Sequence, residues 1–148
     1  MLKETLIQIY EADIKKVIGE IEKYVNEEDV WKLADGITNS GGNLALHLIG
    51  NIKHFFGANL GKTGYVRARE LEFADKDVSR ADLVAGLEEA SKVLKDALNG
   101  LSDEQFEAEY PEEIFGGGHK TSAIAIYMLS HLNYHLGQIN YHRRLLSK

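Results

Sequence analysis

The stretch His131-Leu-Asn-Tyr-His135-Leu-Gly-Gln138-Ile-Asn-Tyr-His142 repeats three histidines and one glutamine at spacings of four, three and four residues. These spacings follow the period of an α-helix, in which successive residues turn by about 100°. The four polar side chains therefore share one face of a predicted helix. Because Cβ atoms four residues apart on a helix are about 5–6 Å apart, His131 and His135 can converge on one metal ion. His142 lies about 10.5 Å beyond His135 along the axis and cannot share that ion.

The rest of this predicted helix is strongly apolar. Its apolar residues are Ala123, Ile124, Ile126, Met128, Leu129, Leu132 and Leu136. They leave the helix little polar surface, so most of it is expected to be buried. A buried imidazole needs a hydrogen-bond partner or a metal ion.

Composition bounds the class of protein. The chain has 148 residues, of which 44% are hydrophobic and 27% charged, and this size predicts one domain over residues 1–148. The net charge of −6, with scattered basic residues, argues against binding to nucleic acid. The chain has no cysteine, so any metal must be bound by nitrogen and oxygen. No apolar run is long enough to span a membrane and no signal peptide is visible, so a cytoplasmic protein is expected.

Apolar residues recur at helical spacing in four stretches, which predicts an all-α fold. The predicted helices cover residues 2–25, 43–60, 79–100 and 121–146. Gly61 is predicted to close the second helix in a left-handed conformation. Thr121 or Ser122 is expected to cap the fourth helix.

Two of the connecting segments carry structural information. Residues 26–42 contain Trp31 and the breaks Asp35-Gly36 and Gly41-Gly42, which predict a loop that can cover a pocket. Residues 61–78 are too mixed in pattern for a core helix. This connector can extend about 60 Å, far enough to return along a whole helix. The second and third helices therefore need not be antiparallel, and four helices in a small chain favour a bundle with inward-facing sites.

The second predicted helix adds two further histidines, His47 and His54, which lie nearly in phase. They sit about 10.5 Å apart along the axis, so only one can join a metal held by the fourth helix. Three neutral imidazoles would form an open metal site. The alternative is that His131 and His135 are two core histidines bonded to Tyr or Asn side chains. The pattern lacks the His-Glu-xx-His motif, so no general base is identified.

Three segments carry a family resemblance. They are Leu46-His47-Leu-Ile-Gly-Asn51-Ile, Arg67-Ala-Arg69-Glu70-Leu-Glu72-Phe73 and His131-Leu-Asn-Tyr-His135-Leu-Gly137-Gln138-Ile. In these segments the chain resembles the DinB-like, or YfiT-like, superfamily of small proposed metalloenzymes, over nearly its whole length. The resemblance implies a four-helix bundle in up-down-down-up order, with the long crossover between helices two and three. It also implies a divalent metal ion held by His47, His131 and His135.

Members of this superfamily have diverse functions. They include thiol S-transferases, thiol-dependent isomerases and proteins named as hydrolases. The leading hypothesis is a metal-dependent enzyme in which Zn, Ni or Fe activates water or a small thiol. Because the chain has no cysteine, the thiol would be a low-molecular-weight compound acting with a small-molecule substrate. The alternatives are a metal-binding or stress-response module without catalysis, and a dimerising helical domain with an empty site.

Further expectations concern the surroundings of the site. His47, rather than His54, is predicted as the third ligand, because it matches the motif. Trp31, Glu70, Glu72 and His142 are predicted to line the mouth of a substrate pocket above the metal, with one coordination position open to water. For His142 the alternative is a helix-end cation. A homodimer is also expected, through apolar residues beside the first helix's core stripe. These residues are Ile7, Ile18 and Val25.

Overall fold

Four long helices dominate the computed structural model, which describes all residues from 1 to 148. They are α1 (Leu2–Glu22), α2 (Gly41–Ile52), α4 (Arg80–Asn99) and α6 (Thr121–Leu146). Shorter elements are the 3₁₀ turn η1 (Glu27–Trp31), the π-helical η2 (Lys53–Ala58), α3 (Arg69–Ala74) and α5 (Asp103–Phe106). The protein is all-α, and its only β pairing is an isolated bridge between Glu109 and Lys120.

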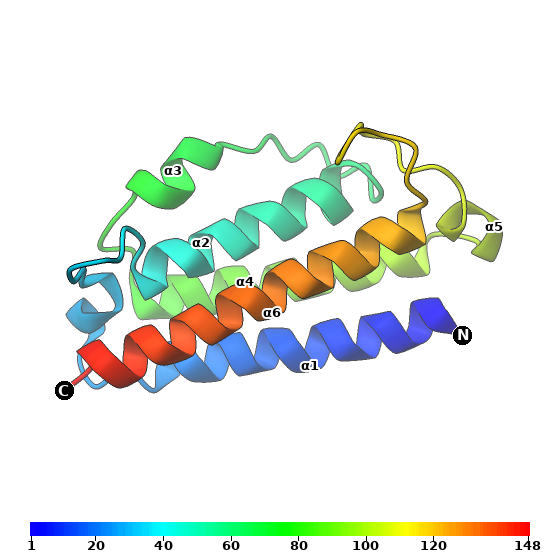
Figure 1. The fold of residues 1–148 in the computed structure, drawn as a ribbon. Helices are drawn as coiled ribbons and strands as arrows, with labels where there is room; N and C mark the ends of the chain where they lie inside the picture. The colour runs from blue at the N-terminus through cyan, green and yellow to red at the C-terminus, as the bar shows by residue number, and fades with distance from the viewer.

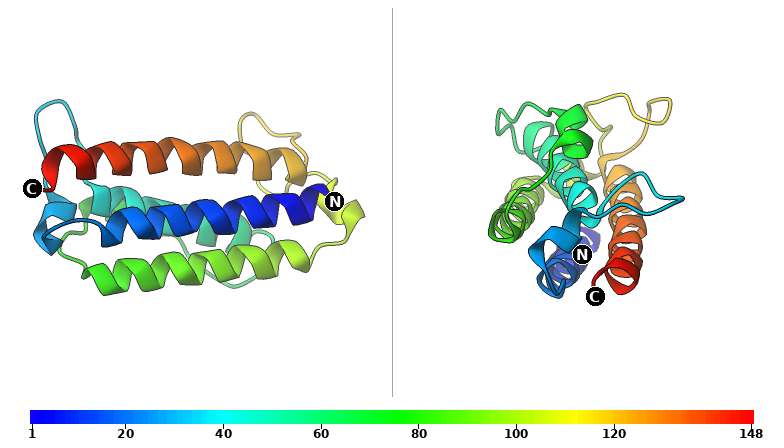
Figure 2. Two further views of the ribbon diagram at one scale, coloured as in Figure 1. Left: turned by 90° about the horizontal axis from the view of Figure 1, so that it is seen from below. Right: turned by 90° about the vertical axis from the view of Figure 1, so that its left-hand side faces the viewer.

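The four long helices pack side by side. Both α1 and α2 pack against α4 and α6, so α1 lies diagonally opposite α2. Figure 1 shows α1 and α6 running in one direction and α2 and α4 in the other, with the two termini at opposite ends of the molecule. Figure 2 shows α6, α1 and α4 side by side in the view from below. The important consequence is that α2 and α6, which carry the histidines, are antiparallel neighbours.

The long connector between α2 and α4 contains a helix that its mixed sequence pattern did not predict. In Figure 1, α3 lies over α2 after the chain has returned along it. Asn43, in the first turn of α2, donates from Nδ2 to the carbonyls of Glu72 (3.0 Å) and Asp75 (2.7 Å). These two hydrogen bonds from one side-chain amide therefore hold the C-terminal half of α3 against the start of α2.

The boundaries of α2 differ from those predicted. The helix begins at Gly41, because the Ser40 hydroxyl caps it by accepting from the backbone N–H of Asn43 at 3.1 Å. Gly41 and Gly42 are therefore not breaks. A Cβ at Gly42 would lie 2.7 Å from the ring of Trp31, so the glycine allows that ring to pack closely.

The far end of α2 also differs from the prediction. The helix continues as the π-helical η2, and Gly61 does not adopt the left-handed conformation. Lys62 takes it instead, with φ of 53°. At the other boundaries, α1 ends at Glu22, and Lys120 occupies the cap position of α6 without a side-chain hydrogen bond.

A cluster of 26 buried hydrophobic residues fills the space between the long helices. Tyr10 is fully buried in it, and its hydroxyl donates to the carbonyl of Ala125 at 2.6 Å, joining α1 to α6. Ile7, which was expected at a dimer surface, belongs to this core with 5% exposure. No helix is both long and apolar enough to cross a membrane.

His142 joins three segments at the C-terminal end of α6. It is 6% exposed, accepts from the Tyr24 hydroxyl through Nδ1 (2.6 Å) and donates through Nε2 to the Lys32 carbonyl (2.8 Å). Burial lowers the pKa of His142, although the hydrogen bond to Lys32 acts in the opposite direction. The ring is therefore neutral at pH 7, and the interpretation of His142 as a helix-end cation is wrong.

This lowered pKa predicts a pH-dependent stability. Below about pH 6.5, His142 in the unfolded chain takes up a proton that the folded protein binds only at lower pH. Because the unfolded chain then binds more protons, the free energy of unfolding should fall as the pH falls from about 6.5 toward the lowered pKa. We expect the free energy of unfolding to fall less over this pH range in His142→Gln than in the wild type. Urea unfolding with a chelator at about pH 7.5 and about pH 5.5 measures it, and an unchanged decrease would contradict the prediction.

Candidate metal centre

Three imidazoles meet between α2 and α6. The Nε2 atom of His131 lies 3.0 Å from Nε2 of His47 and 3.1 Å from Nε2 of His135. All three residues offer ligand atoms within 4.8 Å of one another, so the group could hold a metal ion. His47 is buried, whereas His131 and His135 are partly exposed. The group is therefore not completely buried.

Helix geometry explains this convergence. His131 and His135 are one turn apart on α6, so their rings lie on the same face at adjacent levels. His47 comes from α2, which packs antiparallel to α6. The two Nε2 separations from His131 are within a few tenths of an ångström of what tetrahedral bonds of about 2.0–2.1 Å require. The type and closeness of these three donors therefore fit a divalent ion.

Glu72 holds the ring of His47 in the orientation that such a site needs. The Nδ1–H of His47 donates to Oε1 of Glu72 at 2.9 Å, because a carboxylate can only accept. Arg67 donates to both oxygens of the same carboxylate, from Nε at 2.8 Å and from Nη2 at 2.9 Å. Burial raises the pKa of Glu72, but the hydrogen bonds from His47 and Arg67 outweigh it and lower the pKa overall. Glu72 is thus an anion that leaves the Nε2 lone pair of His47 free.

His135 has a similar partner and His131 does not. The Nδ1–H of His135 donates to Oε1 of Gln138 at 2.6 Å, which again leaves Nε2 as the free lone pair. Nδ1 of His131 is buried without a hydrogen-bond partner. Without an ion, His131 has a single proton on Nε2. This proton cannot form a full hydrogen bond to the Nε2 lone pairs of both His47 and His135. A metal ion accepts three imidazole lone pairs at once, so the polar atoms of this cluster fit one.

The protonation states also suit metal binding. Burial, the neighbouring imidazoles and the guanidinium groups of Arg67 and Arg69 together lower the pKa of His131 to about 4, with burial the largest cause. Burial also lowers the pKa of His135, despite the opposing hydrogen bond to Gln138. Both rings are neutral at pH 7, which is the state in which histidine binds metals.

Gly50 makes room for the carboxylate of Glu72. A Cβ built at Gly50 would collide with Oε2 of Glu72, which rests directly on the backbone of α2. Gly50 lies three residues after His47, on the same face of the helix. Position 50 therefore needs glycine so that the Glu72 carboxylate can approach the helix backbone, and not because its backbone conformation is unusual.

The predicted site residues fall in different places. Glu72 contacts His47, whereas Glu70 is exposed on α3. Trp31 packs against Gly42 at the start of α2. His54 lies in the π-helical turn and pairs with Glu112 through Nε2 at 3.0 Å, away from the other histidines. The structure thus brings His47, and not His54, to the pair on α6.

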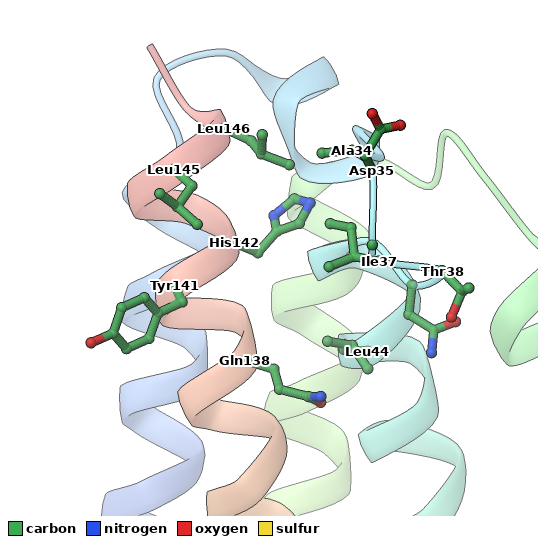
Figure 3. Close-up of a pocket in the computed structure, with 12 residues that line it drawn as sticks. Ala34, Asp35, Ile37, Thr38, Leu44, Gln138, Tyr141, His142, Leu145 and Leu146 are labelled. Atoms are coloured by element: carbon green, nitrogen blue, oxygen red, sulfur yellow. The ribbon is translucent and has the colours of Figure 1, made fainter.

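His142 lines a cavity of about 380 Å³ near the metal centre (Figure 3). The cavity lies between the end of α6, the start of α2 and the loop at residues 34–39, so this loop borders a pocket as the sequence suggested. Its lining residues are Ala34, Asp35, Gly36, Ile37, Thr38, Asn39, Leu44, Gln138, Tyr141, His142, Leu145 and Leu146. Trp31, Glu70 and Glu72 are not among them, so the four residues predicted for one pocket mouth do not share this cavity.

The cavity begins one helical turn from the histidines. Leu44 lines it and lies three residues before His47 on α2, while Gln138 lines it and lies three residues after His135 on α6. Three residues advance a helix by about 4.5 Å. Gln138 therefore touches both the cavity and a histidine of the metal centre.

Several residues important to the site had no role assigned from sequence. Arg67 and Gly50 lie in the segments that carried the family resemblance, but nothing local shows that they meet at Glu72. Asn43, which holds α3, was assigned only as a helix start. The sequence offered two signals. Asn43 is a polar residue in the first turn of an apolar helix, and Gly50 lies three residues after His47 on the same helix face.

Gly50→Ala provides a test of the packing around Glu72. The added methyl group should displace the carboxylate from His47 and lower zinc affinity roughly 10-fold to 100-fold, as loss of a histidine's supporting partner does. Competition with a chromophoric chelator measures the affinity, and circular dichroism checks the helix content. Gly137→Ala is the matched control, because a Cβ there meets nothing within 4 Å. Equal affinities in the two variants would contradict this role of Gly50.

Comparison with known proteins places the chain in a family. No curated protein matches it. Residues 3–148 match the family described as "Protein of unknown function (DUF1572)". Because this match spans almost the entire sequence, the protein belongs to the DUF1572 family.

Proposed function

We propose that this protein is a divalent-metal-dependent enzyme of hydrolase or thiol S-transferase type. The observation that carries the proposal is the convergence of three Nε2 atoms from His47, His131 and His135. An ion such as Zn, Ni or Fe held there would lower the pKa of a water molecule or a small thiol and so create a nucleophile at neutral pH. Since the chain has no cysteine, a thiol would have to come from a low-molecular-weight compound.

The surrounding residues support an open site over a closed structural one. The group contains three histidines and no fourth His, Asp or Glu, and three protein ligands are typical of catalytic zinc sites. Glu72 and Gln138 hold two of the rings in fixed orientations, so the donors are arranged before the ion arrives. The partial exposure of His131 and His135 gives a small molecule access.

The adjacent cavity supports binding of a substrate. Its walls are largely apolar, with Ile37, Leu44 and Leu145 among them, and Gln138 provides a polar group near the metal centre. His142 contributes a wall and not an acid or base, because both of its nitrogen atoms already have partners. An apolar portion of a substrate can occupy this space while its reactive group lies at the histidines.

The helix order supports the link to the DinB-like superfamily. With α1 and α6 running one way and α2 and α4 the other, the chain fits the proposed up-down-down-up four-helix bundle. The segment carrying α3 would be the long crossover. Under this proposal the DUF1572 family is a branch of the metal-binding bundles of that superfamily.

A metal-binding module without catalysis is the second candidate. Its support is the centre's position between two long helices, where an ion would join α2 to α6. A stabilising ion would not require an apolar cavity one turn away. This feature favours the enzyme.

Metal binding should depend on His47 and not on His54. We expect His47→Ala and His131→Ala to lower the affinity for zinc at least 10-fold to 100-fold, because each removes a ligand. His54→Ala is the control, since His54 pairs with Glu112. Elemental analysis after reconstitution of metal-free protein with Zn, Ni or Fe measures occupancy. Loss of binding in His54→Ala with normal binding in His47→Ala would refute the assignment.

The same variants separate the enzyme from the module. Reconstituted protein is screened with small thiols and electrophiles and with ester and amide substrates. We expect turnover by the wild type and by His54→Ala, but not by His131→Ala. A thermal stabilisation by metal without turnover of any substrate class would favour the module.

We further propose a homodimer formed through α6. Tyr127, Tyr134 and Tyr141 recur every seven residues on this helix and are 47%, 66% and 62% exposed. This spacing places them in one stripe, as a self-complementary interface of two helices requires. Light scattering should show a dimer at high micromolar concentration that Tyr134→Lys converts to a monomer. A monomeric wild type would refute the dimer.

A further inference from the structure

Arg69 is a charged residue beside the metal centre that has no partner of opposite charge. It is exposed at the start of α3, and no carboxylate of the chain lies within ion-pair distance of it. Its guanidinium group lies over the ring of Phe73, 5.2 Å from the ring centroid. Phe73 in turn packs on His47, with 4.8 Å between the ring centroids. One aromatic ring therefore separates the cation of Arg69 from a predicted metal ligand.

The neighbouring Arg67 shows why this lack of a partner is informative. Arg67 donates to both oxygens of Glu72, so its charge is neutralised inside the structure. The same short segment thus contains one arginine that supports the site and one that is available to a ligand. Stacking on Phe73 limits the motion of the Arg69 side chain while leaving its donors exposed.

The charges around the centre favour an anion. Glu72 and Arg67 cancel each other, and histidines bind a metal ion as neutral imidazoles. A bound divalent ion would therefore keep its positive charge, and Arg69 would add another beside it. This local excess stands out in a chain with a net charge of −6.

We propose that Arg69 is a specificity-determining residue that binds a carboxylate or similar anionic group of the substrate or thiol while the reacting group lies at the histidines. The inference rests on the proposed function, which it extends by naming an anionic class of ligand. The planar guanidinium group can bind a carboxylate through two parallel hydrogen bonds. Such a ligand would carry two groups, one for the metal and one for Arg69.

Cobalt-loaded protein allows this to be tested without an assay of activity. Thiols that reach the metal change the visible absorption of Co(II), so their dissociation constants can be measured by titration. The probes are 3-mercaptopropionate, which carries a carboxylate, and 2-mercaptoethanol, which is neutral. The variants are Arg69→Gln and Arg69→Lys. Arg144→Gln is the matched control, because Arg144, like Arg69, stacks on an aromatic ring, in this case Tyr141 at 5.0 Å, and lacks an ion pair.

We expect Arg69→Gln to weaken binding of 3-mercaptopropionate roughly threefold to tenfold, as loss of a partly exposed charged contact does. Binding of 2-mercaptoethanol should not change, and Arg69→Lys should have an intermediate effect. Arg144→Gln should bind both thiols as the wild type does. Equal weakening of both thiols in Arg69→Gln, or weakening of neither, would overturn the role of Arg69. The carboxylate of 3-mercaptopropionate can also chelate cobalt directly. This effect is the same in every variant, so it cancels when the variants are compared.

A failure of the proposed function gives a different result. If neither thiol changes the cobalt spectrum of the wild type, activation of thiols is wrong. Malonate and acetate then replace the thiols, since malonate can place one carboxylate at the metal and the other at Arg69. A preference for malonate that Arg69→Gln abolishes supports the inference, whereas the absence of this preference overturns it.

Discussion

The candidate site depends on the hydrogen bonds that the carboxylate of Glu72 accepts from Arg67 and His47. An unpaired anion at this buried position would be costly, so it is stable only with partners of opposite polarity. Arg67 supplies the positive charge, and His47 supplies a ring N–H. The carboxylate can reach them only because Gly50 has no side chain. One residue thus closes the connector onto α2 and orients the histidine that α2 contributes to the centre.

Buried polar contacts also hold the segments around the cavity. Ser40 and Asn43 start α2 and tie it to α3, and His142 joins the end of α6 to Tyr24 and Lys32. The loop at residues 34–39 lies between these two anchored points and forms one wall of the cavity. The hydrophobic core holds α2 against α6. The polar contacts then determine what surrounds the histidines at one end of it.

These features together describe a centre that is rigid on one side and accessible on the other. His47 is buried and held by an ion pair, while His131 and His135 are partly exposed on α6. A cavity lies one turn along the helices and an unpaired arginine lies beyond Phe73. A structural ion would be served by the histidines alone. The surrounding groups matter only if a second molecule binds there, which is why the proposed enzyme accounts for more of the structure.

Local sequence determined the helices and half of the centre. Periodic apolar residues define the four long helices, and the spacing of His131 and His135 alone places both rings on one face, because these relations act within a few residues. Tertiary structure decided the rest. His47 and His54 are nearly in phase, so periodicity alone cannot choose between them. The family resemblance favoured His47, and the register of α2 against α6 is what brings it to the pair. The partners of Glu72, the place of α3, the need for Gly50 and the burial of His142 each require segments far apart in the chain to meet. Such contacts leave no periodic signal in the sequence, since they depend on how the helices pack.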